Sequence, residues 1–185
     1  MADLPTIEEL QKLPLRAIAA YAARAARRVR PVLQGVVDDG LVEEILSIVE
    51  SVVSAEDLGQ IDASSAMFAA SRIVGASQSI QISDSQILAV MCLVGTARTA
   101  YAVLQCVDNP DRESRYVAYA ASAAECAAGD YVALDEPAAT LAAKAARADY
   151  EMFLKTQGQH ETVTVGRPID LSGLGSIWPE SVGGH

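Results

Sequence analysis

The sequence predicts an all-α protein: a single-domain, mainly antiparallel bundle of six to seven helices with an irregular C-terminal tail packed on it. Apolar residues make up 51% of the 185-residue chain but aromatic residues only 5%, so alanine, valine, leucine and isoleucine carry the apolar content. Such small side chains favour helices that pack closely. Apolar residues also recur every three to four positions in long segments, and the short connections between these segments favour antiparallel neighbours.

Caps and a proline mark the first helices. Thr6 and Glu9 match a capping box, which opens a short helix. Pro14 begins a long arginine-rich helix, which we expect to end or kink at Arg30–Pro31 because proline lacks the backbone donor. Leu41–Val53 repeats apolar residues on one side, with carboxylates and serines on the other, and therefore predicts an amphipathic helix.

Further helices follow along the chain. We expect them at 62–77, from Ser83 or Asp84 to about Val107, at 112–128, and from about 136 to about 156. Asp62 caps the first of these, and Gly158 closes the last. The helix that ends near Val107 is apolar on every side at Ile87–Val94, which predicts that it is the central, most buried helix.

The chain divides into a helical bundle domain at 1–158 and an extended tail at 159–185. Glycine, proline, serine and threonine dominate the tail, but Ile169, Leu171 and Trp178 are spaced along it. Such a tail is either disordered or held against the helices by its apolar residues. We expect it to lie across the helical domain.

Charge and cysteine content favour a soluble cytoplasmic protein. A net charge of −10 disfavours binding to nucleic acid or to an anionic membrane. Cys92, Cys106 and Cys126 are odd in number and lie in apolar segments, so we expect reduced, buried thiols. The N-terminal residues lack the apolar core of a secretory signal. The most apolar stretch, Ile87–Val94, is too short to span a membrane.

Catalytic motifs are absent from the sequence, so we expect no enzyme, no cofactor and no metal site. His160 and His185 are the only histidines, and both lie in the tail, which makes each a poor general base and leaves zinc without a ligand set. Arg98 stands out in an apolar helix. It either emerges at the wetter end of that helix, pairs with a buried acid such as Glu125, or anchors a small ligand beside Tyr101.

The arginine-rich helix contains five of the 14 basic residues within positions 16–33. At about 100° per residue, Arg16, Arg27 and Arg30 share a narrow sector opposite the apolar side. The simplest interpretation is a solvated face whose long stems cover apolar surface. Binding of a phosphate or nucleic acid, and ion pairing within the chain or with a partner, are the alternatives.

An acidic segment follows. Between Arg30 and Arg72 there is no lysine, arginine or histidine, whereas residues 38–62 contain eight carboxylates. The candidate partner-binding residues are Asp38, Asp39, Glu43, Glu44 and Glu50. They either pair with the neighbouring arginine-rich helix or present an acidic face to a basic protein, which would speed association and select against wrong partners.

These observations lead to a hypothesis of function with two alternatives. The hypothesis is a noncatalytic protein-interaction module that binds a basic protein partner through the acidic segment. The first alternative is a homo-oligomeric structural or scaffold protein, whose acidic and arginine-rich helices pair between subunits. The second is a small-ligand-binding protein with a pocket near Arg98.

Two segments also suggest a family. LPLRAIAAYAARAARRVRPVL near the N-terminus and VGRPIDLSGLGSIWPE in the tail resemble segments of uncharacterised helical proteins from planctomycetes. The first segment is also distantly similar to Imm-5-like immunity proteins. Together the segments cover about a fifth of the chain. Ala25 replaces a cysteine of the family pattern, Leu33 an aromatic residue, and Leu171 and Ser176 prolines. The resemblance implies an all-α fold and a role in neutralising a toxin, with no catalytic residues.

Overall fold

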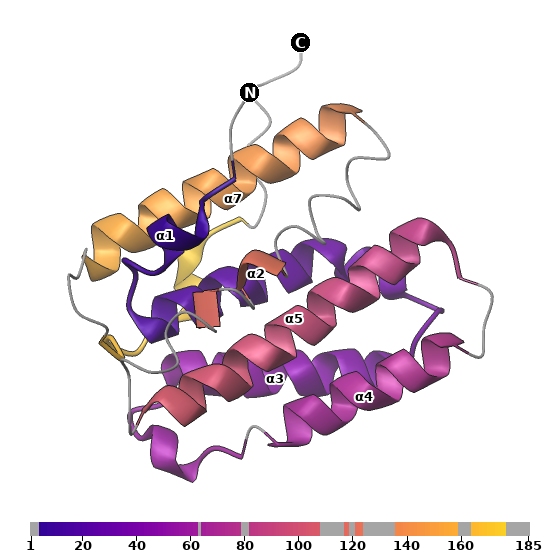
Figure 1. The fold of residues 1–185 in the computed structure, drawn as a ribbon, viewed down its shortest axis with the longest axis horizontal. Helices are drawn as coiled ribbons and strands as arrows, with labels where there is room; N and C mark the ends of the chain where they lie inside the picture. The colour runs from indigo at the N-terminus through magenta and orange to yellow at the C-terminus, as the bar shows by residue number, and fades with distance from the viewer. Residues whose placement is uncertain are drawn as a thin grey trace.

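A computed structural model describes residues 4–62, 64–78, 82–107, 117–118, 121–123, 136–158 and 164–176. The fold is all-α, as predicted, and no strand occurs within these ranges. The helices are α1 (Ile7–Leu10), α2 (Leu15–Leu33), α3 (Asp39–Ser54), α4 (Ser64–Gln78), α5 (Asp84–Cys106) and α7 (Glu136–Gln157) (Figure 1). Two short 3-10 turns, η1 (Leu58–Gln60) and η2 (Leu171–Leu174), complete the described elements.

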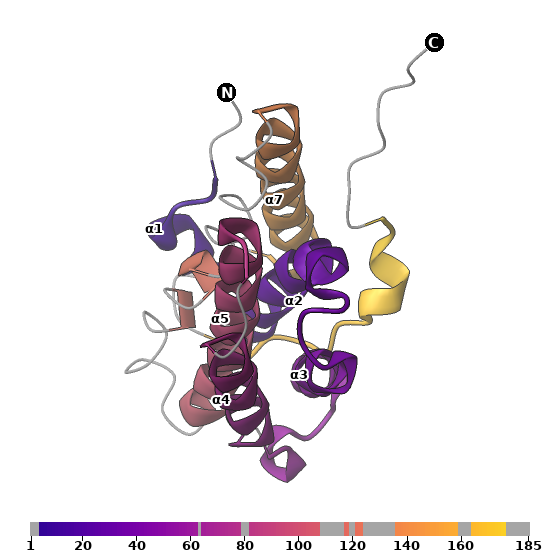
Figure 2. The ribbon, with the colours of Figure 1, turned by 90° about the vertical axis from the view of Figure 1, so that its right-hand side faces the viewer.

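Helices α2 to α5 form a four-helix bundle. Each packs against the next along the chain, and α5 packs back against α2, so the four helices surround one core. Short connections make consecutive helices antiparallel. Figure 2 shows two layers side by side: α4 and α5 form one, and α2 and α3 form the other, to their right. Helix α7 packs on α2 outside this bundle (Figures 1 and 2).

The most buried helix is α2, and not the helix that ends near Val107. Fifteen of its 19 residues are buried, because α3, α5, α7 and the tail surround it. Helix α5 is buried on the sides that face α2, α3 and α4, but Ile87 is 42% exposed and Met91 56%. The prediction that this helix is the most buried one is therefore wrong: an apolar surface on every side does not ensure neighbours on every side.

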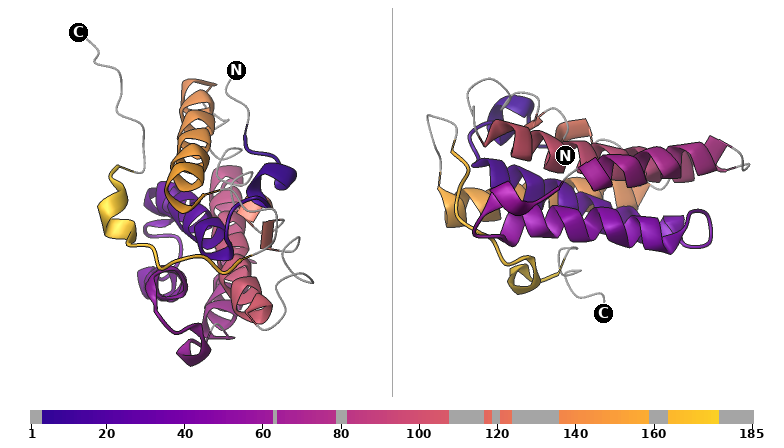
Figure 3. Two further views of the ribbon diagram at one scale, coloured as in Figure 1. Left: turned by 90° about the vertical axis from the view of Figure 1, so that its left-hand side faces the viewer. Right: turned by 90° about the horizontal axis from the view of Figure 1, so that it is seen from below.

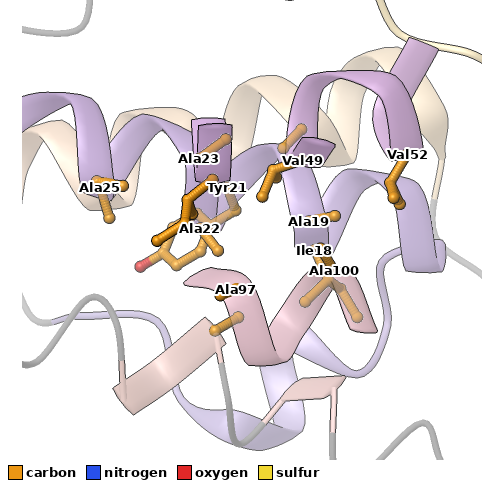
Figure 4. Packing of buried hydrophobic residues seen from close by; sticks show 14 of the residues in the cluster. Ile18, Ala19, Tyr21, Ala22, Ala23, Ala25, Val49, Val52, Ala97 and Ala100 are labelled. Carbon is orange, nitrogen blue, oxygen red and sulfur yellow. The ribbon is translucent and has the colours of Figure 1, made fainter. Parts of the chain in front are cut away.

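Alanine allows α2 and α5 to approach closely. Figure 4 shows Ala22 and Ala97 at this contact, beside Tyr21. The hydroxyl of Thr96 on α5 donates across the helix pair to the backbone carbonyl of Ala22, with an oxygen–oxygen distance of 3.1 Å. A side-chain hydrogen bond to the partner helix's backbone requires small residues at the contact, which the alanine content supplies.

Most predicted helix boundaries are confirmed within a few residues. Thr6 and Ser83 each form a complete capping box, and the backbone nitrogen of Ser64 donates to Asp62 at 2.8 Å. Helix α2 runs through Pro31 and ends at Leu33, two residues after the expected position. Proline in the last turn of a helix removes only one hydrogen bond, which a well-packed helix tolerates.

The described part of the tail, 164–176, lies across the bundle as predicted, with Ile169 and Leu171 buried (Figure 3). It also caps α2, whose N-cap residue, Pro14, has no side chain that can accept a hydrogen bond. The backbone nitrogens of Leu15 and Arg16 donate instead to the carbonyls of residues 164 and 165, at 2.9 and 3.1 Å. The tail therefore satisfies donors that a helix N-terminus leaves unpaired.

Some expectations fall partly outside the described residues. Of the predicted helix at 112–128, only 117–118 and 121–123 are described; these are helical, and Val117, Ala118 and Ala121 are buried. Cys92 and Cys106 are buried thiols, whereas Cys126, Glu125, His160, Trp178 and His185 lie outside the described ranges.

Helix α5 is the one described helix long and apolar enough to cross a membrane. Its 23 residues are many more than the apolar stretch Ile87–Val94, which alone is too short to span a membrane. However, 61% of its most apolar window is buried inside the fold. This is the pattern of a core helix in a soluble protein, which is compatible with the predicted solubility.

Candidate functional site

The acidic and arginine-rich helices pair within one chain. Arg27 on α2 forms an ion pair with Glu50 on α3, and Arg30 forms one with Glu43. Both pairs are partly exposed, so each contributes less than about 1 kcal/mol to stability. Two of the five candidate acidic residues therefore have a structural role. The homo-oligomer alternative placed ion pairs between acidic and arginine-rich helices of different subunits; here these two helices pair within one chain.

The other candidate acidic residues lie exposed at the N-terminal end of α3. Asp38 is the N-cap of α3 and accepts a hydrogen bond from the backbone nitrogen of Gly40 at 2.8 Å. Asp39 and Glu44 follow it on the exposed side of the helix. No ion pair joins any of the three to another residue in the described ranges.

A second group of carboxylates follows the C-terminal end of α3. Glu56, Asp57 and Asp62 are exposed and, among the residues that the structure describes, also have no ion pair. The two groups are separated by the 16 residues of α3, or about 24 Å at 1.5 Å per residue. We call these six carboxylates the acidic surface: Asp38, Asp39, Glu44, Glu56, Asp57 and Asp62.

Local hydrogen bonds keep part of the acidic surface ionised. The backbone nitrogen of Gly59 and the side chain of Gln60 donate to Asp57 and lower the pKa of its carboxyl. Hydrogen bonds from the Ser64 side chain and backbone lower the pKa of Asp62 in the same way. Both groups therefore keep their negative charge to a lower pH than an ordinary aspartate.

The predicted basic face of Arg16, Arg27 and Arg30 is wrong at Arg16, which is only 3% exposed. Its guanidinium donates to the backbone carbonyls of Val53, at 3.2 Å, and Ala55 at the C-terminal end of α3. A cation is favourable there because the last carbonyls of a helix carry partial negative charge. Burial lowers the pKa of the Arg16 guanidinium, against the opposing effect of Glu56.

A buried charge cluster joins α2, α7 and the tail. Arg24 and Arg28, one turn apart on α2, both pair with Asp149 on α7, with 2.7 Å between Arg24 Nε and Asp149 Oδ1. Arg24 also donates to the backbone carbonyl of Ser176, at 2.6 Å. Desolvation raises the pKa of Asp149, while the two guanidinium groups oppose that shift. These arginines are buried and hold α2, α7 and the tail together.

The sequence contains a signal for this cluster. On α7 the buried residues Ala142, Ala146 and Phe153 recur at helical spacing, and Asp149 falls in the same stripe. A carboxylate in an apolar stripe needs a buried cation as its partner. Asp149 is not among the residues predicted above from the sequence.

The remaining candidate, Arg98, emerges on the exposed side of α5, as does Tyr101, which is 37% exposed. Arg98 is therefore exposed, as the first of the three expectations held, although it lies on the side of α5 and not at its end; Glu125, named in the second, is outside the described ranges. Groups of three or more residues that could hold a metal ion do not occur in the described ranges.

Comparison of the chain with family models, curated proteins and solved structures found no match in any of the three. The resemblance to planctomycete proteins and to Imm-5-like immunity proteins therefore stays a prediction.

Proposed function

We propose that this protein is a noncatalytic protein-interaction module that binds a basic protein partner through the acidic surface. The observation that carries the proposal is that six exposed carboxylates form no ion pair in the described structure, although α2 pairs with Glu43 and Glu50 nearby. Like charges held together at a surface repel one another and are a cost to the free protein. A basic partner would relieve that cost on binding.

The chemistry of the partner follows from this charge. Complementary potentials speed encounter and discriminate against acidic competitors. The resemblance to immunity proteins favours a toxin, such as a basic nuclease, as the partner, and the cytoplasm as the place of action. A toxin gene beside the gene for this chain would support that assignment.

Capture of partners from lysate, with quantitative identification at low and moderate salt, tests the proposal. Neutralising Asp39→Asn, Glu44→Gln and Glu56→Gln removes three charges without breaking an ion pair or a helix cap of the described structure. Each exposed charge contributes up to about 1 kcal/mol, so we expect the triple variant to bind roughly tenfold more weakly. Reversal of Glu43 or Glu50 would be a poorer test, because each holds an arginine of α2.

A matched control removes the same charge elsewhere. Glu8→Gln, Glu151→Gln and Asp170→Asn neutralise three exposed carboxylates on α1, on α7 and at the N-cap of η2, where asparagine also serves as a cap. We expect this control to retain the partner and its salt dependence. Binding that is indifferent to salt, or that both variants weaken equally, would contradict the proposal.

A further inference from the structure

Every exposed residue of α5 lies in one stripe along the helix: Asp84, Ile87, Met91, Arg98, Tyr101 and Gln105. Together with half-buried Val94, their spacing alternates between three and four residues, which is the a/d pattern of a coiled-coil seam. The seam extends over three heptads. We propose that a second copy of this chain docks on this seam, with its own α5 antiparallel to the first.

Apolar residues dominate the seam. Met91 is 56% exposed, Ile87 42% and Tyr101 37%, and they are three of the five large apolar side chains that the described structure exposes most. Water is a poor environment for an aligned row of such groups. A second α5 offers the matching row, since residues at a and d of one helix pack into the spaces of the other.

Charge determines the direction of the second helix. Asp84 and Arg98 are the only charged residues in the seam, and both occupy a positions. Parallel helices would place Arg98 against Arg98 of the second copy, which is repulsive. In antiparallel helices, each residue at heptad position a packs against a residue at position d of the other helix. Met91 therefore faces Val94 of the second copy, and Ile87 faces Arg98 of the second copy. Asp84 then lies one turn from that arginine, within reach of its long side chain.

The acidic surface leaves this seam unobstructed. Helices α5 and α3 lie in different layers of the bundle (Figure 2), so two acidic copies can meet through α5 with their α3 ends apart. The two proposals are therefore independent. Loss of one binding event would leave the other measurable.

A contact along one helix buries less than the roughly 800 Å² per partner of a standard interface, so we expect a weak dimer. Sedimentation equilibrium of the full chain from about 10 µM to about 1 mM covers the range in which such an interface forms. We expect the mass to rise from that of the 19.4 kDa monomer toward twice that value. A monomer mass throughout the range would overturn the proposal.

Substitutions locate the interface. Met91→Lys places a charge in a central layer and should raise the dimer dissociation constant at least about tenfold. Leu141→Lys, at a 36% exposed residue of α7, is the matched control and should leave that constant unchanged. Arg98→Glu or Asp84→Arg alone should weaken the dimer, and the two together should restore it. Equal effects of Met91→Lys and Leu141→Lys would refute the assignment to α5.

A spin label tests the direction. Gln105→Cys, in a chain that also carries Cys126→Ser, holds the label at the exposed C-terminal end of the seam, whereas Cys92 and Cys106 are buried. Antiparallel helices would separate two such labels by about 40 Å, and parallel helices by about 10 Å. The longer distance is expected, and the shorter one would exclude the antiparallel arrangement.

Discussion

The buried charge cluster at Asp149 is expected to be the most sensitive point of the fold. Asp149→Asn preserves the shape of the side chain but removes the anion that faces Arg24 and Arg28. All three residues are 3–4% exposed, so water cannot replace the lost charge. Removing one member of a buried ion-paired group costs about 3–5 kcal/mol, which exceeds the net worth of the pair because buried charge of one sign remains.

Urea unfolding followed by far-ultraviolet circular dichroism measures this loss. In a chain of this size, a loss of about 3–5 kcal/mol in the free energy of unfolding corresponds to a fall of roughly 6–20 °C in the melting temperature. Glu151→Gln, two residues away on the exposed side of α7, is the matched control and should change stability by less than about 0.5 kcal/mol. A loss below about 1 kcal/mol for Asp149→Asn would refute the reasoning.

An apolar replacement of the whole cluster sharpens the test. The triple variant Arg24→Met, Arg28→Met and Asp149→Leu leaves no buried charge at this point. Well-packed apolar residues often replace buried ion pairs at little cost. We therefore expect the triple variant to lose less stability than Asp149→Asn alone, and the opposite order would show that hydrogen bonds to the tail matter more than charge.

Two further predictions concern the chain ends. Gly166→Ala should cost about 2–4 kcal/mol of stability in thermal unfolding, because φ is +83° and an added Cβ would lie 2.5 Å from Pro14 Cβ. The control is Gly175→Ala, where φ is +73° but the surrounding space is open, and it should cost only about 1–2 kcal/mol. Equal losses in the two variants would contradict a clash with Pro14. Glu9→Gln should destabilise by roughly 0.5–1 kcal/mol at pH 7. Hydrogen bonds from the Arg147 side chain and then the Thr6 backbone lower the pKa of Glu9, so its contribution is present above pH 4.5 and is lost as pH falls through the lowered value. Urea titrations of both proteins at pH 7 and pH 3 check this, and a penalty of the same size at both would argue against a role for the charge.

Local patterns predicted most helices because their causes are local. The capping boxes at Thr6 and Ser83 depend on residues three positions apart, and both form. The apolar stripe of α3 likewise places Leu41, Ile45 and Val49 in the core. Pro31 is the exception, since packing of α2 overrides a local preference for termination.

The candidate site was only partly predictable. The acidic segment and the arginine-rich helix are visible in composition, and two of their residue pairs meet as one interpretation expected. Which arginines are buried depends on α3, α7 and the tail, which are remote in sequence. The helical angle of Arg16 alone could not reveal that its neighbour is the C-terminal end of α3.

The order of residues along the chain determined where helices begin, which side of each is apolar, and how much negative charge follows Arg30. These properties arise from contacts within one or two turns. Tertiary structure decided that α2 is central, that the tail caps it, and that α5 exposes a seam. Such outcomes depend on which surfaces meet across large sequence separations, and periodicity contains no information about the identity of the neighbour.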